Sequence, residues 1–264
     1  KLNALSTSQR IESRYRDYLT ATFAPQRLEW RQEFENALAD FDISNGPFLQ
    51  ASAPFEHGAT IQDLITQGVL DPGLRRIDQN VLPADRPLYL HQEQATRRAV
   101  ADKRNLIITT GTGSGKTECF LIPIINGLLN EIEDGTIETP GVRALLLYPM
   151  NALANDQVKR LRQLLAGIPE ITFGRYVGET QQKLRDAEDD MRARYPDEPR
   201  LANELISREQ MQATPPHILL TNYAMLEYLL LRPTDAPLFD GATADHWRHI
   251  VLDEAHVYAG AQGA

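Results

Sequence analysis

Short apolar runs separated by longer amphipathic segments dominate the last two thirds of the chain. The runs cover residues 106–108, 144–148, 171–177, 217–221 and 249–252. Continuous apolar runs of this length are typical of strands buried in a parallel sheet, and a helical segment is expected after each of the first four. The alternation predicts an α/β fold with a parallel sheet, in which ligands bind where the strands end.

The first part of the chain follows a helical period instead. Apolar residues at helical spacing predict two helices separated by Pro25. A third, short helix is expected to begin at Thr60, a capping residue with Asp63 three positions further on. The aromatic side chains of this part fit a helix core better than the alternative, a platform on which bases stack. We predict a helical N-terminal extension over residues 1–83 and a second domain over residues 84–264.

A glycine-rich loop follows the run at 106–108 and leads into a helix. Its candidate nucleotide-binding residues are Thr110, Gly111, Thr112, Gly113, Ser114, Gly115, Lys116 and Thr117. Glycines let the backbone curl tightly, so that N–H groups and the helix N-terminus point at phosphate oxygens. Lys116 is placed to reach the β- and γ-phosphates, and the Thr117 hydroxyl to hold Mg²⁺. The loop therefore predicts a nucleoside triphosphate site.

Gln92 stands shortly before this loop, at the start of a helix predicted over 92–102. A glutamine amide can pair with the donor and acceptor edge of adenine. A lone glutamine at a helix start is usually a solvated surface residue, but its place before a phosphate loop makes it a candidate adenine reader. Tyr89 or Leu90 is then placed to pack on the base. The expected cofactors are ATP and Mg²⁺.

Two adjacent carboxylates follow the run at 249–252. Asp253 is placed to supply a second ligand for Mg²⁺, and Glu254 to take a proton from the attacking water. We therefore assign catalytic roles to Lys116 and Glu254. His256 is expected near the γ-phosphate, where it can couple the nucleotide to the rest of the protein.

Composition narrows the class of protein. The chain has 264 residues, 42% of them hydrophobic, and a formal net charge of −9, which disfavours general electrostatic binding of nucleic acid but leaves a local basic track open. A single cysteine, Cys119, excludes a disulfide framework. No apolar run reaches membrane-spanning length and no signal peptide is visible, so a cytoplasmic location without membrane partners is expected. The stretch from 181 to 214 carries charges of alternating sign and is expected to form surface helices.

These motifs together resemble those of superfamily 2 helicases. Gln92, the glycine-rich loop and Asp253-Glu254-Ala255-His256 are similar to the Q motif, motif I and motif II; Pro149-Met150-Asn151-Ala152-Leu153 is similar to motif Ia, Tyr176-Val177-Gly178-Glu179-Thr180 to motif Ib, and Thr221-Asn222-Tyr223-Ala224-Met225-Leu226 to the segment after it. The combination most resembles the YprA/Hrq/Lhr-like DExH DNA helicases, a branch that includes large relatives encoded in phage-defence loci. The resemblance implies a RecA-like P-loop NTPase domain with helices on both faces of its sheet.

The resemblance also implies a nucleic-acid track. Its residues are Pro149, Asn151, Gly178, Thr180, Thr221 and Asn222, which are expected to contact the sugar-phosphate backbone of one strand. Short polar side chains and helix N-termini suit that contact. The alternative is that these residues only cap helices, and both roles can hold together. The expected partner is single-stranded or partly duplex DNA, with RNA less favoured.

Two parts of such helicases do not follow in the sequence: motif III and a second RecA-like domain with its arginine finger. We therefore expect the intact protein to continue past Ala264 and the sheet to have a gap beside the strand at 249–252. The favoured function is the first motor domain of an ATP-dependent DNA helicase or translocase, nearly inactive by itself. The alternative is a nucleotide-gated clamp or scaffold with protein partners in a multi-subunit assembly.

Overall fold

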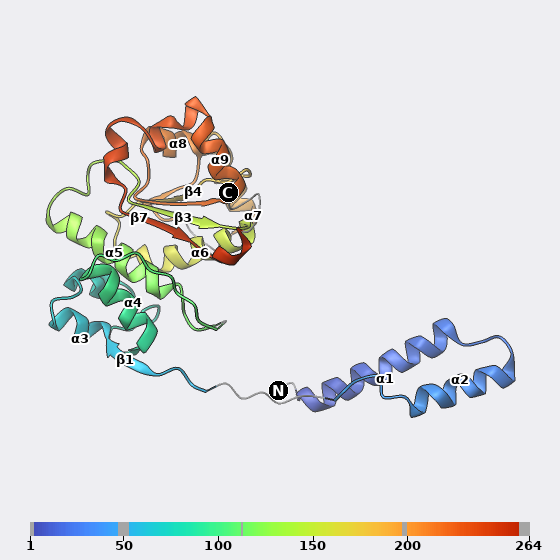
Figure 1. Cartoon of the computed structure of the whole chain (residues 1–264). Coiled ribbons are helices and arrows are strands. Elements are labelled where there is room, and N and C mark those ends of the chain that lie inside the picture. The colour runs from blue at the N-terminus through green and yellow to red at the C-terminus, as the bar shows by residue number, and fades with distance from the viewer. Residues whose placement is uncertain (1–2, 47–52, 112, 197–199, 259–264) are drawn as a thin grey trace. The chain divides into compact units, whose positions relative to one another are not determined.

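The computed structural model describes residues 3–46, 53–111, 113–196 and 200–258. They divide into two compact units, Lys1–Pro54 and Phe55–Ala264 (Figure 1). The boundary lies earlier than the one predicted at residue 83. The reason is hydrophobic burial: Ile61 and Leu64 belong to the same core as the apolar residues of the sheet.

The first unit contains the two helices predicted on either side of Pro25, α1 (Ala4–Phe23) and α2 (Leu28–Asp40). Arg16 of α1 donates to the carbonyl oxygen of Phe41 at 2.8 Å, just beyond α2. No residue of either helix is buried, so the predicted helix core is not formed within this unit. Two helices alone cannot enclose their aromatic side chains.

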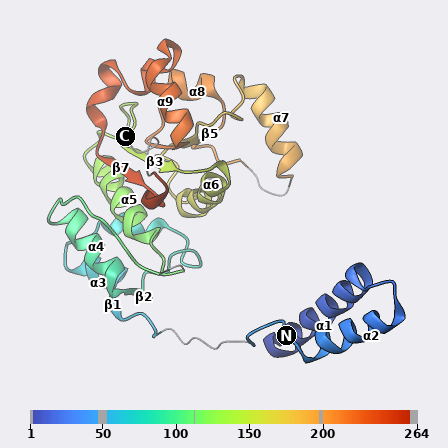
Figure 2. The same cartoon turned by 45° about the vertical axis from the view of Figure 1, so that its right-hand side comes forward.

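The second unit is built on a five-stranded sheet in the order β5-β4-β6-β3-β7, in which all neighbouring strands are parallel. Figure 1 and Figure 2 show it from two directions. The strands are β3 (Ala144–Tyr148), β4 (Phe173–Arg175), β5 (Glu204–Leu205), β6 (Ile218–Asn222) and β7 (His249–Leu252). The parallel sheet predicted from the alternating pattern is confirmed.

Helices cover both faces of this sheet. Leu146 and Tyr148 point into the larger core, which they share with α5 (Glu118–Glu133) and α6 (Asn151–Leu165). Leu145, between them, belongs to a second core with Met225 and Leu229 of α9 (Tyr223–Leu231). Successive strand residues face opposite sides, so a continuous apolar run is what a sheet covered on both faces requires.

The remaining elements extend these layers. A small antiparallel sheet of β1 and β2 precedes α4, which contacts α5. The elements are β1 (His57–Thr60), α3 (Ile61–Thr66), η1 (Pro72–Arg76), β2 (Pro87–Tyr89), α4 (Leu90–Val100), α7 (Leu184–Arg194), α8 (Arg208–Ala213), η2 (Pro233–Leu238), η3 (Gly241–His246) and η4 (Ala255–Val257). The short helix predicted from Thr60 is α3, and Thr60 and Asp63 form the expected capping box.

The strand predicted at 106–108 is wrong for this structure. Residues 103–111 form no helix or strand, and the side chain of Ile107 is 94% exposed. β7 lies at the sheet edge next to β3, with Ile250 67% exposed. The run before the loop pairs with none of the described strands, and a segment without a backbone partner does not join a sheet.

The fifth strand of the sheet comes from a place that the sequence pattern did not indicate. β5 lies within the stretch 181–214, which was predicted to form surface helices only and does contain α7 and α8. A strand of two residues is too short to show a period. Glu204 is nevertheless buried, because Arg162 of α6 pairs with both of its carboxylate oxygens at 2.8 Å.

Candidate nucleotide and nucleic-acid site

The glycine-rich loop lies directly before α5 and folds around the Lys116 side chain. The Lys116 ammonium donates to the carbonyl oxygens of Thr110 at 3.1 Å and Gly111 at 3.3 Å. The Thr110 and Ser114 hydroxyls are 2.6 Å apart. Gly113 and Gly115 have φ of 75° and 71°, a left-handed conformation that other residues rarely adopt. Thr112, also predicted to bind nucleotide, lies outside the described residues.

Gln92 connects α4 to this loop. Its Nε2 donates to the carbonyl oxygen of Gly115 at 2.9 Å, and its Oε1 accepts from the backbone N–H of Tyr89 at 2.9 Å. The side chain is only 4% exposed. His91 Nε2 also lies 3.0 Å from the carbonyl oxygen of Ser114. The amide predicted to read adenine is thus beside the loop as expected, but both of its ends are engaged by backbone groups that position the loop.

This geometry predicts the effect of Gln92→Ala. The variant loses the two hydrogen bonds through which the buried Gln92 side chain positions the loop, and this should weaken nucleotide binding by about 10-fold. ATP and inosine triphosphate, which lacks the adenine amino group, should be affected equally, because the lost partners are backbone groups. Isothermal titration of both nucleotides checks this, with Gln94→Ala on the exposed side of α4 as the matched control. A loss confined to ATP would return Gln92 to the adenine-reading role.

An aromatic cluster beside Gln92 was only partly foreseen from the sequence. Tyr89 stacks on His91 with ring centroids 5.7 Å apart, and Phe55 lies 5.2 Å from Tyr89. The sequence predicts that Tyr89 or Leu90 packs on the base, but it does not predict the contacts of Phe55 and His91 with Tyr89. Antiparallel pairing of β1 with β2 brings the neighbourhood of Phe55 to Tyr89, and no local pattern encodes that pairing.

The start of α5 carries the candidate metal ligand. Thr117 stands at its N-terminus and makes no capping hydrogen bond with its side chain, so the hydroxyl is not used by the helix. Glu118 is buried and pairs with Arg160 of α6, which fixes the start of α5 against α6. Burial raises the pKa of the Cys119 thiol to about 11, as suits the inert core residue expected there.

The two predicted carboxylates follow β7. The backbone N–H of Asp253 donates to the carbonyl oxygen of Leu147 at 3.0 Å, which holds Asp253 at the end of β3. Burial raises the pKa of its carboxyl group, and the Lys116 ammonium acts in the opposite direction. Lys116 and Asp253 are therefore within electrostatic reach of one another. Glu254 has φ of 49°, and its carboxylate lies 3.3 Å from His256 Nδ1.

Two of the predicted nucleic-acid residues, Asn151 and Asn222, meet at the ends of β3 and β6, where Glu179 from the loop after β4 joins them. Asn222 donates through its side-chain amide to Asn151 Oδ1 at 2.6 Å, and Asn151 donates to Glu179 at 3.2 Å. The Asn222 side chain also caps α9, accepting from the backbone N–H of Met225 at 2.7 Å. The Asn222 side chain therefore both caps α9 and holds Asn151. The chain Asn222–Asn151–Glu179 is called the polar track below.

The two predicted threonines are used inside the fold instead. The Thr221 hydroxyl is fully buried and donates to the carbonyl oxygen of Tyr176 at 2.7 Å. Thr180 is 7% exposed, and its hydroxyl donates to the carbonyl oxygen of Arg175 at 2.9 Å. These contacts hold the loop after β4 against β6. Pro149 lies between β3 and α6, and Gly178 lies in that loop, with open space beside its Cα.

The fold and the site together define a helicase ATPase domain. The DEAD/DEAH box helicase family matches residues 89–264, and the chain belongs to this family. It is 30% identical, over 84% of its length, to the Druantia protein DruE of Escherichia coli (strain UMEA 4076-1), of which it covers 17%. It is also 30% identical, over 63% of its length, to the ATP-dependent helicase Lhr-Core of Methanothermobacter thermautotrophicus, of which it likewise covers 17%.

A solved structure adds a comparison of folds. The DUF1998 helicase MrfA bound to DNA and AMPPNP is 25% identical, with a TM-score of 0.51 over 73% of this chain and 22% of that one. The chain thus spans about a fifth or less of the length of these relatives. The predicted membership of the YprA/Hrq/Lhr-like helicase branch is confirmed. Among the described residues, no helix has the length and apolar character needed to span a membrane.

Proposed function

We propose that this chain is the first motor domain of a DNA translocase that couples ATP hydrolysis to movement along one strand. The proposal rests on one observation: the candidate nucleotide residue Asp253 and the candidate strand residue Asn151 both lie at the carboxyl end of β3. Asp253 is held at the end of β3 by Leu147, and Asn151 of the polar track begins α6 just after the same strand. A change at the nucleotide can therefore reach the strand-binding residues through one rigid element.

The chain's own residues fit the chemistry of ATP hydrolysis. Lys116 would exchange its two loop carbonyl partners for phosphate oxygens. Thr117 and Asp253 would hold Mg²⁺, which neutralises charge on the phosphates when bound. Their chemistry fits the metal because the Thr117 hydroxyl makes no capping hydrogen bond and the Asp253 carboxylate follows β7 directly, at the end where its backbone N–H pairs with Leu147 of β3. Glu254 would orient and deprotonate the attacking water. His256, whose Nδ1 lies 3.3 Å from the Glu254 carboxylate, would couple the position of Glu254 to the rest of the protein.

The polar track suits the backbone of a strand. Amide side chains and helix N-termini contact phosphate and sugar without reading bases, and Asn151 and Asn222 each stand at the start of a helix. DNA is the favoured strand because MrfA is bound to DNA in its solved structure. In the intact protein a second RecA-like domain would complete the nucleotide site from the other side, and further protein partners would assemble with it.

ATP turnover by the intact protein, with and without single-stranded DNA, tests the proposal. A translocase should be strongly stimulated by the strand, because hydrolysis is tied to strand contact. Asn222→Ala should reduce this stimulation while leaving the basal rate unchanged. Slow turnover that DNA does not change would favour the alternative, a nucleotide-gated clamp or scaffold.

A further inference from the structure

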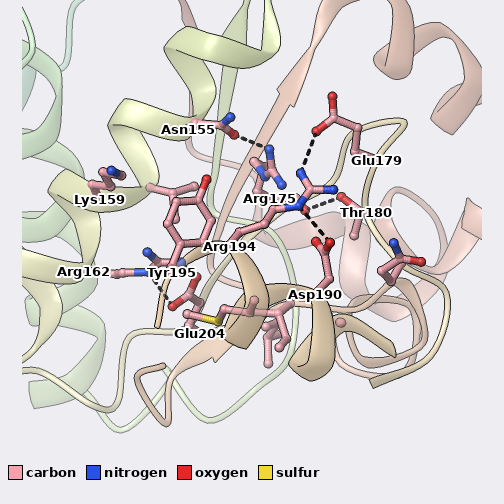
Figure 3. Close-up of a pocket in the computed structure, with 16 residues that line it drawn as sticks. Asn155, Lys159, Arg162, Arg175, Glu179, Thr180, Asp190, Arg194, Tyr195 and Glu204 are labelled. Carbon is pink, nitrogen blue, oxygen red and sulfur yellow. Dashed lines mark hydrogen bonds and ion pairs between the residues drawn. The ribbon is translucent and has the colours of Figure 1, made fainter. Parts of the chain in front are cut away.

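A tight turn follows β4 and carries Glu179 of the polar track. The backbone N–H of Thr180 donates to the carbonyl oxygen of Val177 at 3.0 Å, which closes a four-residue β-turn over residues 177–180. The Thr180 hydroxyl accepts from the backbone N–H of Val177 at 2.9 Å, so the same residue closes the turn twice. Figure 3 shows the side chains of Glu179 and Thr180 on this segment. The segment is called the 177–180 turn.

Arg208, the first residue of α8, holds the carbonyl oxygens of this turn. Its guanidinium donates to the carbonyl oxygens of Thr180 at 2.8 Å, Gly178 at 2.9 Å and Val177 at 3.3 Å. The backbone N–H of Arg208 donates to the next carbonyl oxygen, that of Gln181, at 2.9 Å. Three of the four carbonyl groups of the turn therefore depend on one side chain. The planar fork of a guanidinium presents several donors at once, which the single ammonium of a lysine does not.

The Arg208 side chain is itself fixed in orientation. Its guanidinium carbon lies 5.4 Å from the ring centroid of Tyr176, a cation–π contact. The Tyr176 hydroxyl donates to the buried carboxylate of Asp235 in η2, and Gln212 Nε2 donates to Tyr176 at 3.1 Å and to Asp235 at 2.8 Å. Within the part of the chain that the structure describes, Arg208 pairs with no carboxylate, so its donors are directed at the turn.

Glu179 connects this turn to the start of α6. Its carboxylate accepts from the side-chain amide of Asn151 at 3.2 Å. Arg194 of α7 lies 3.7 Å from the same carboxylate but is closer to Asp190, at 2.8 Å. Both Arg194 and Glu179 are about half exposed, and ion pairs of that kind restrain a side chain weakly. The position of Glu179 therefore depends chiefly on the backbone that Arg208 holds.

We propose that Arg208 is a positioning residue for strand binding, which fixes the 177–180 turn and thereby holds Glu179 against Asn151 in the polar track. The inference rests on the proposed function, because it requires the strand to lie on that track. Arg208 acts through the turn and not by contact with the strand. A residue of the stretch 181–214, which the sequence predicts to form surface helices, thus sets the geometry of a candidate strand contact.

The test is ATP turnover by the intact protein as the concentration of single-stranded DNA is raised. Arg208→Ala removes three hydrogen bonds and releases the turn, so the DNA concentration for half-maximal stimulation should rise roughly 5- to 10-fold. Turnover at saturating DNA should stay within about 2-fold of wild type, as expected when only binding is weakened. Arg208→Lys keeps the charge but reaches fewer carbonyl oxygens, and it should give an intermediate shift. Circular dichroism checks folding; if the alanine variant does not fold, the lysine variant carries the same test.

A double-mutant cycle with Glu179→Ala separates positioning from general support of the fold. If Arg208 acts by holding Glu179 against Asn151, the contact is already absent in Glu179→Ala. Adding Arg208→Ala to that background should then change the half-maximal DNA concentration by less than about 2-fold. A residue that only supports the fold would cause the same loss in both backgrounds, because its effect would not pass through the Glu179 side chain.

Arg192→Ala is the matched control. Arg192 belongs to the same charged stretch, its side chain is 74% exposed, and it pairs with Asp189 at 3.2 Å. The variant removes the same charge without touching the 177–180 turn. The half-maximal DNA concentration should change by less than about 2-fold, as expected for an exposed surface pair.

The outcomes distinguish this inference from the proposed function. If DNA stimulates the wild-type protein and Arg208→Ala responds to DNA as wild type does, the positioning role is wrong and the proposed function stands. A full loss that persists in the Glu179→Ala background, or an Arg208→Lys variant equal to wild type, would also overturn the positioning role. A wild-type protein that DNA does not stimulate would overturn both proposals.

Discussion

Lys116→Ala should abolish ATP hydrolysis by the intact protein, with a fall of roughly 10²–10³-fold or more in turnover, the range for losing one stabilising partner of developing charge. The Lys116 ammonium already contacts the carbonyl oxygens of Thr110 and Gly111, so it stands within the loop that would cradle the phosphates. No other lysine lies in the loop sequence. Phosphate release in a steady-state assay measures the effect.

Lys183→Ala provides the matched control, because Lys183 is an exposed lysine just before α7. It removes the same charge without touching the loop and should keep wild-type turnover. Circular dichroism of both variants establishes that the fold is retained. Turnover above about one tenth of the wild-type rate for Lys116→Ala would contradict its assignment as the main cationic partner of the phosphates.

Glu254→Gln should separate binding from chemistry. The variant keeps the size of the side chain but cannot accept a proton, so kcat should fall by roughly 10²–10⁴-fold, the range for a lost general base. ATP affinity should stay close to wild type, because Asp253 and the loop remain intact. The Glu254 carboxylate is 42% exposed and lies beside His256, so no buried contact is broken. Single-turnover hydrolysis together with nucleotide titration measures both quantities.

Two further variants test whether the effect of Glu254→Gln is specific to that carboxylate. Asp253→Asn should weaken Mg²⁺-dependent nucleotide binding, because it removes the proposed metal ligand and leaves Glu254, the proposed base, in place. Glu227→Gln, an exposed carboxylate on α9, should behave as wild type. Near-normal turnover in Glu254→Gln would show that a different residue activates the water, and Asp253 would then be the first to examine.

A nucleotide site could be predicted from the sequence because its candidate residues stand next to one another in the chain. The loop around Lys116 and the pair Asp253 and Glu254 each depend on a local backbone path, a tight turn before a helix and the end of a strand. Such paths are set by glycines and by short apolar runs, which a sequence displays directly. The same holds for the capping box of α3, which needs only Thr60 and Asp63.

The N-terminal helices show that a local sequence pattern predicts where helices form but not which of their side chains are buried. The sequence placed α1 and α2 on either side of Pro25, because helix formation depends on neighbouring residues. It also assigned their aromatic side chains to a helix core, whereas Tyr15, Tyr18 and Trp30 are about half exposed in the structure. Whether an apolar face is buried depends on what packs against it, and an isolated segment does not contain that information.

Long-range pairing decided the rest. The sequence by itself determined the parallel α/β fold and the helicase family, and it predicted the loop and carboxylate residues as the nucleotide site. Only the tertiary structure showed that Gln92 braces the loop, that 106–108 lies outside the sheet and that Arg208 holds the 177–180 turn. The physical reason is that a strand forms only beside a partner, and a side chain far away in sequence is brought close by strand order, which no local period records.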